Sequence, residues 1–227
     1  MTHLNENWYD THAMVPLNPA SSFVLSGPSG SGKTTFIRRF LEDMDGMYST
    51  DAPVETLFCY NVHQDIYDVM GREIENITFM NGLPTSEQLD KFLKDNRHRL
   101  LILDDMQNLV KNSELIEHIF TAGCHHRHLS IFYVTQNLFQ QGTNARTITL
   151  NTFYHLLFPS TRDRAQIAAI GRQLFWGKSK SFVNAYEDVV NNKHGYLLVD
   201  NSPGADPAYR LRTQIFPGED TIIYQIQ

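Results

Sequence analysis

Short apolar segments alternate along the chain with longer segments in which apolar residues recur every three or four positions. The short segments predict β-strands. They fall at residues 22–25, 54–60, 77–80, 99–103, 129–134, 152–158, 195–199 and 211–216. Helical periodicity or a helix-start signal marks residues 34–43, 85–96, 112–122 and 164–176. This alternation predicts an α/β fold in three layers, with a mostly parallel central sheet flanked by helices.

The first 21 residues show neither pattern. Pro16 and Pro19 discourage a helix there, so residues 1–21 are predicted to be an N-terminal arm and residues 22–227 a single domain. A chain of 227 residues suits one large α/β domain. No apolar run approaches the ~20 residues that a membrane span needs, and residues 1–19 lack a signal-peptide pattern. With two cysteines, Cys59 and Cys124, we expect a soluble intracellular protein in a reducing compartment.

A glycine-rich segment follows the first predicted strand and matches the pattern G-x-x-x-x-G-K-T. Its glycines let consecutive backbone N–H groups turn toward phosphate oxygens, and the N-terminus of the next helix adds partial positive charge. Lys33 would reach the β- and γ-phosphates, and the Thr34 hydroxyl would bind Mg²⁺. The sequence therefore predicts a P-loop NTPase. We expect the nucleotide to contact Gly27, Pro28, Ser29, Gly30, Ser31, Gly32, Lys33, Thr34 and Thr35.

Two carboxylates end the predicted strand at residues 99–103. Asp104 and Asp105 directly follow its apolar residues, and ionised groups beside a core need partners. Mg²⁺ is the natural partner. Asp104 would hold the metal, directly or through water, and Asp105 would orient the attacking water or accept its proton. The alternative is a strand that ends in a polar loop, with Asp105 as a helix cap.

The predicted strand at residues 129–134 is followed by Thr135, Gln136 and Asn137. If the sheet places this strand beside the Asp104 strand, Gln136 approaches the γ-phosphate. Its amide can donate to a phosphate oxygen and accept from water, so we expect Gln136 to sense the γ-phosphate. The alternative is an ordinary polar start of a loop.

Charge is distributed unevenly along the chain. The net charge is −6, but residues 125–182 carry seven Lys or Arg and one acid, Asp163, so that this block is +6 and the remainder is −12. Such asymmetry can place a basic, nucleic-acid-binding face on an acidic protein. The alternative is a chance cluster on a solvated surface.

The three motifs occur in the order GPSGSGKTT, LLILDD and SIFYVTQN. This set resembles the FtsK/HerA branch of P-loop ATPases, and most closely the viral genome-packaging ATPases of poxviruses, giant viruses, virophages and Polinton/Maverick-like elements. The resemblance extends over residues 23–217, with further matching segments at residues 60–67, 125–128, 136–139, 146–151, 158–163, 195–200 and 211–213. Many relatives have Asp-Glu where this chain has Asp104-Asp105. The shorter side chain would shift the water slightly and keep its role.

The resemblance implies a homo-oligomeric ring around double-stranded DNA that uses ATP and Mg²⁺ to package a viral genome. Each ATP site would lie between neighbours and receive an arginine finger in trans, which stabilises the charge of the transferring phosphoryl group. Arg127 and Arg146 are the candidates. We prefer Arg146, because residues 142–144 next to it suggest a loop that projects toward a neighbour. Either arginine would otherwise contact DNA phosphate or form a surface ion pair.

The resemblance also implies partners and a location. Beyond DNA and further copies of the chain, we expect a capsid or portal component as a partner. The protein would act in the infected host cell, in cytoplasm or nucleus, or be associated with the virion.

Two other functions fit parts of the sequence. The string Ser26-Gly27-Pro28-Ser29-Gly30-Ser31-Gly32-Lys33 also resembles the loop of a guanylate-type nucleotide kinase, although no arginine-rich lid is evident and the Asp104-Asp105 pair has no role in one. A non-catalytic, ATP-gated assembly protein would bind the nucleotide without turnover. The presence of every catalytic position weighs against that function.

Overall fold

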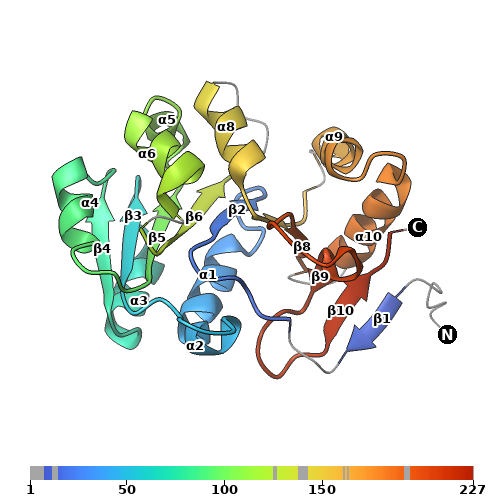
Figure 1. The fold of residues 1–227 in the computed structure, drawn as a ribbon, viewed down its shortest axis with the longest axis horizontal. Coiled ribbons are helices and arrows are strands. Elements are labelled where there is room, and N and C mark those ends of the chain that lie inside the picture. Colours follow the sequence, from blue (N-terminus) through green and yellow to red (C-terminus); the bar gives the residue numbers. More distant parts are fainter. Residues whose placement is uncertain are drawn as a thin grey trace.

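A ten-stranded sheet with helices on both faces organises the described part of the chain (Figure 1). The computed structural model describes residues 8–11, 15–124, 127–137, 143–160, 162, 164–191 and 195–226, without the side chains of 8–11, 122–123 and 143–146. No helix among these residues has the length and apolar character needed to cross a membrane.

Six strands form a parallel block. In spatial order they are β4 (Ile77–Asn81), β3 (Thr56–Tyr60), β5 (Arg99–Asp104), β6 (Leu129–Thr135), β2 (Ser22–Ser26) and β7 (Tyr154–Leu157). Every pairing within the block is parallel. Each strand coincides with one of the apolar segments, so the predicted α/β sandwich with a mostly parallel sheet is confirmed.

Alternate residues of each strand enter two separate cores. In β5, Leu100 and Ile102 face one core, and Leu101 and Leu103 face the other. The first core lies beneath α1 (Lys33–Glu42), α2 (Met44–Met47) and α3 (Asp65–Glu73). The second lies beneath α4 (Ser86–Phe92), α5 (Gln107–Val110), α6 (Glu114–His118), the π-helix η1 (Ile119–Gly123), α8 (Thr143–Asn151), α9 (Arg164–Leu174) and α10 (Ser179–Val190). Strands buried on both faces explain the near-continuous apolar segments.

The remaining strands are antiparallel. They are β8 (Leu197–Asp200), β9 (Leu211–Thr213), β10 (Thr221–Tyr224) and β1 (Trp8–Thr11), which extend the sheet beyond β7 in this order. Two helices, α9 and α10, connect β7 to β8. A single helix after β7 would return the chain to the edge of the sheet where β7 begins, and the next strand would then be parallel to β7. The second helix carries the chain back to the edge where β7 ends, so β8 is antiparallel to β7.

The sequence prediction omitted α10, although its signal was present. Phe182, Ala185, Tyr186 and Val189 are buried at helical spacing. It also omitted α3, α8, β10 and β1. The strand β1 falls within residues 1–21 and pairs with β10, and Leu17 is 2% exposed in the core under α1. The boundary at residue 21 stays a prediction.

A buried ion pair joins the antiparallel strands. Arg212 on β9 is 1% exposed and donates to Asp200 on β8 at 3.1 Å. The other carboxylate oxygen of Asp200 accepts hydrogen bonds from the backbone N–H and the hydroxyl of Ser202. Removing one member of such a pair leaves an uncompensated charge in the interior.

We therefore predict that Asp200→Ala lowers the free energy of unfolding by about 3–5 kcal/mol. The control is Asp90→Ala, which removes an exposed pair with Arg127 and is expected to cost less than about 1 kcal/mol. Urea unfolding of both variants measures the difference. Similar losses of unfolding free energy in the two variants would show that the buried ion pair stabilises the fold no more than the exposed one.

Candidate active site

The loop between β2 and α1 requires glycine at three positions. Gly30 and Gly32 have φ values of 76° and 104°, in the left-handed region that side chains disfavour. A Cβ on Gly27 would lie 2.7 Å from the Cβ of Phe158 on the neighbouring strand connection. Gly32 is the N-cap of α1, and the first turn of that helix contains no acidic residue. The loop therefore brings free backbone N–H groups and the positive end of α1 to one place.

Lys33 lies inside this loop. Its ammonium donates to the carbonyl oxygens of Gly27 at 2.6 Å and Pro28 at 2.8 Å. Burial lowers the pKa of Lys33, and the negative charges of Asp104 and Asp105 oppose that shift. The cation is thus positioned between the loop and the two carboxylates.

A chain of hydrogen bonds holds the carboxylate of Asp104 at the end of β5. The Tyr67 hydroxyl donates to Asp104 Oδ2 at 2.8 Å, and Gln64 Nε2 donates to the Tyr67 hydroxyl oxygen at 2.8 Å. Burial raises the pKa of Asp104, against the effects of the Tyr67 hydrogen bond and of the Lys33 charge. One oxygen of Asp104 is therefore fixed by Tyr67.

Asp105 adopts a strained backbone conformation. Its φ is 53°, which costs a non-glycine residue on the order of 1–2 kcal/mol. Its side chain accepts a hydrogen bond from Gln136 Nε2 at 3.1 Å. Such strain persists only where the surrounding structure imposes it, and it gathers at functional sites.

The three sequence motifs meet in one cavity of about 320 Å³. Pairing explains the meeting, because β6 lies between β5 and β2, with Asp104 opposite Val134 and Ser26 opposite Thr135. Parallel strands bring their carboxyl ends to the same edge of the sheet. The cavity is lined by Ser29, Gly30, Gly32, Lys33, Thr34, Thr35, Gln64, Asp104, Asp105, Val134, Thr135 and Gln136.

This donor set fits a nucleotide with a divalent metal. The loop N–H groups and Lys33 suit phosphate oxygens. Thr34 and Asp104 both line the cavity, and their hydroxyl and carboxylate are hard oxygen ligands of the kind that Mg²⁺ takes. Ser31, also predicted to contact the nucleotide, does not line the cavity, and its Oγ is buried without a hydrogen-bond partner among the described residues.

Not every predicted site residue lines the cavity. Gly27 and Pro28 form the back of the loop through their carbonyl groups. Arg127 lies elsewhere and pairs with Asp90 at 2.9 Å. Residues 143–144, expected in a projecting loop, instead begin α8, which also contains Arg146. Gly142 and the Arg146 side chain lie outside the described residues.

The sequence prediction assigned no role to Gln64 or Tyr67. Gln64 is the N-cap of α3, which follows β3, and β3 pairs with β5 so that Tyr60 lies opposite Asp104. Polar residues just after a strand that neighbours the Asp104 strand were the available signal. Using it required knowing that β3 and β5 are adjacent.

Comparison with known proteins agrees with this geometry. A family model described as an AAA domain matches residues 17–141, more than half of the chain, including the P-loop, Asp104, Asp105 and Gln136. No curated protein matches the chain.

Two solved structures share the fold over most of the chain. One is the genome packaging NTPase B204 of Sulfolobus turreted icosahedral virus 2 in complex with ATPγS, with 14% identity and a TM-score of 0.52. The other is B204, the DNA-packaging ATPase of Sulfolobus turreted icosahedral virus, with 12% identity and a TM-score of 0.54. Each similarity covers 93% of this chain and 100% of the other. With its P-loop sandwich and a family match over residues 17–141, the chain belongs to the AAA domain family of P-loop NTPases.

Proposed function

We propose that this protein is an ATP-hydrolysing subunit of a motor that moves viral double-stranded DNA into a capsid. The observation that carries the proposal is the convergence of the P-loop, the Asp104-Asp105 pair and Gln136 in one cavity. The similarity in fold to two viral packaging ATPases over 93% of the chain supports the choice of DNA as cargo.

The cavity residues divide the hydrolytic work. The loop N–H groups and Lys33 bind the β- and γ-phosphates, and Thr34 and Asp104 are the residues that would hold Mg²⁺. The metal supplies positive charge to the phosphate oxygens. Asp105 orients the attacking water and accepts its proton. A hydrogen bond already links Gln136 to Asp105. The amide proposed to sense the γ-phosphate is therefore in contact with the proposed base.

We place the subunits in a ring, with each ATP site completed by a neighbour. Arg146 is the preferred arginine finger, because Arg127 is engaged with Asp90. The helix α8 that carries Arg146 stands at the margin of the molecule (Figure 1). A guanidinium supplied across an interface stabilises charge on the transferring phosphoryl group.

The basic block gives a candidate DNA-contacting face. Exposed cations gather on α9, on the start of α10 and on the segments flanking α9, where Trp176 is 91% exposed. These cations are Arg162, Arg164, Arg172, Lys178 and Lys180. Neutralisation of phosphates by such side chains is independent of base sequence and weakens with salt. A capsid or portal component, and a location in the infected cell or the virion, complete the proposal.

The first test of the proposal is ATP turnover with and without duplex DNA at low salt. We expect DNA to stimulate the wild-type protein. Lys33→Ala should lower turnover at least about 100-fold, because it removes charge that meets the transferring phosphoryl group. Gln136→Ala should bind ATP normally and lose the stimulation. If ATP turnover does not respond to saturating DNA but requires a nucleoside monophosphate, the protein is a nucleotide kinase instead.

A second prediction concerns Tyr67, which fixes one oxygen of Asp104. Tyr67→Phe should raise the Mg²⁺ concentration for half-maximal turnover about tenfold, as loss of a partner of a metal ligand does. Binding of ATP without metal should not change. The control is Tyr60→Phe, which removes a hydroxyl from a neighbouring ring that packs against Tyr67 at a tilt. Equal Mg²⁺ dependence in both variants would contradict the role of the Tyr67 hydroxyl in positioning Asp104.

A third prediction separates the two arginines. Arg146→Ala should lower turnover about 10³-fold without loss of ATP binding, whereas Arg127→Ala should retain most activity. Mixing Arg146→Ala subunits with Lys33→Ala subunits should restore activity, because some interfaces then combine an intact P-loop with an intact neighbouring Arg146. Mixed rings that form and stay inactive would contradict a finger in trans.

A further inference from the structure

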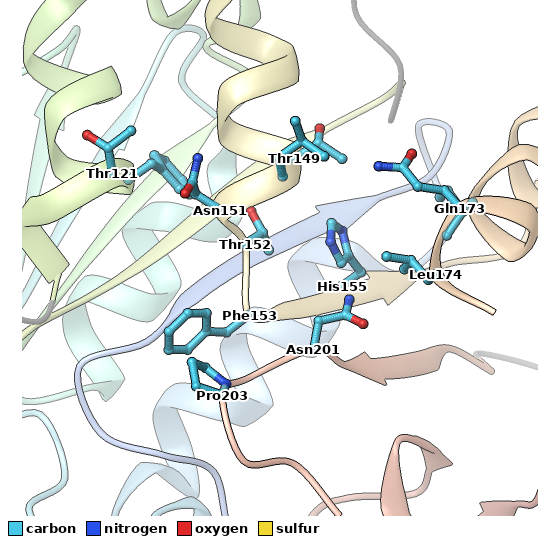
Figure 2. Close-up of a pocket in the computed structure, with 13 residues that line it drawn as sticks. Thr121, Thr149, Asn151, Thr152, Phe153, His155, Gln173, Leu174, Asn201 and Pro203 are labelled. Atoms are coloured by element: carbon cyan, nitrogen blue, oxygen red, sulfur yellow. The ribbon is translucent and has the colours of Figure 1, made fainter. Parts of the chain in front are cut away.

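A second cavity, of about 250 Å³, lies on the face of the sheet that α8 and α9 cover (Figure 2). Its walls come from η1, the end of α8, β7, the end of α9 and the segment after β8, and it shares no lining residue with the nucleotide cavity. No Asp, Glu, Lys or Arg lines it. The cavity is therefore a separate, uncharged site.

His155 lies on the floor of this cavity as a neutral ring. It is 2% exposed, and burial lowers its pKa to about 4, although a hydrogen bond to the Thr149 backbone opposes the shift. A carbonyl oxygen only accepts, so the ring must donate its N–H to Thr149. Nδ1 has no hydrogen-bond partner among the described residues, so the donating nitrogen is Nε2. Nδ1 is then an unprotonated acceptor.

Asn201 supplies the complementary group. Its Oδ1 accepts a hydrogen bond from Arg210 at 2.6 Å, and because a guanidinium only donates, this contact fixes which way the amide is turned. The other end, Nδ2, is buried and lacks a partner within the described ranges. The side chain therefore offers a donor.

The two groups belong to the same cavity. Figure 2 shows His155 and Asn201 among its lining residues, with Thr152 and Gln173 around them and Leu174 on the α9 side. A buried donor or acceptor left without a partner is costly, and the cost falls on the protein until a ligand or water supplies the missing bond. Within one cavity, the two groups suit a ligand that presents one donor and one acceptor.

We propose that this cavity binds an uncharged planar heterocycle of the nucleobase class, which presents an N–H next to a C=O. The N–H donates to His155 Nδ1, and the C=O accepts from Asn201 Nδ2. An ionised ligand is disfavoured, because no lining residue offers a countercharge. A volume of about 250 Å³ is slightly smaller than that of sites for drug-sized ligands, which suits a base or nucleoside. The inference does not depend on the packaging function.

The test uses uridine and 3-methyluridine, which differ only in the N3–H that would reach His155. Neither carries a phosphate, and repeating the titration in Lys33→Ala protein excludes binding at the P-loop. We expect saturable uridine binding by calorimetry and an upfield shift of the His155 Nδ1 signal in ¹⁵N NMR. Binding of 3-methyluridine should be at least about tenfold weaker, since its methyl group leaves Nδ1 unpaired.

Variants of the cavity provide a second, independent readout. Asn201→Asp keeps an oxygen for Arg210 and replaces the donor by an acceptor, so uridine affinity should fall at least about tenfold. Thr121→Ala, at the exposed rim, should change affinity less than about twofold. Three outcomes would each overturn the proposal. The first is no saturable binding of uridine, and the second is equal affinity for the two nucleosides. The third is a lone water that bridges His155 and Asn201, with no effect of uridine on the NMR signal.

Discussion

The parallel register of β2, β6 and β5 is the constraint on which the candidate active site depends. It places Ser26 opposite Thr135 and Asp104 opposite Val134, so that the P-loop, the carboxylate pair and Gln136 leave the sheet at one edge. Because the side-chain period of a strand is two residues, a slip of one residue would turn Asp104 to the other face of β5. The apolar alternation that fills two cores thus also fixes the geometry of the site.

That geometry concentrates polar groups where the interior is otherwise apolar. Asp104 is 5% exposed and tolerable there because Tyr67 donates to it and Lys33 lies near. Asp105 retains a left-handed backbone that its neighbours must impose. The same hydrogen bonds that stabilise these groups also fix where they point, and a hydrolytic site needs this preorganisation because groups already in place need not reorganise as charge develops.

The C-terminal part of the chain adds surfaces beyond the nucleotide cavity. The helix pair α9 and α10 reverses the direction of β8 and carries most of the exposed cations of the basic block. The helix α9 also forms one wall of the uncharged cavity around His155 (Figure 2). A +6 segment and a neutral cavity therefore occur within one region, because the cations face solvent while Ile170 and Leu174 face inward.

The sequence by itself determined the P-loop, the carboxylate pair and most strands, because glycine spacing and apolar periodicity are local properties of the chain. Only the tertiary structure decided that β6 lies between β5 and β2, that Tyr67 on α3 donates to Asp104 while accepting from Gln64, and that Arg127 pairs with Asp90. It also decided that Nδ1 of His155 and Nδ2 of Asn201, both buried and without a partner among the described residues, belong to one cavity. These contacts join residues far apart in the chain, and their formation depends on packing across the whole sheet, which no local spacing records.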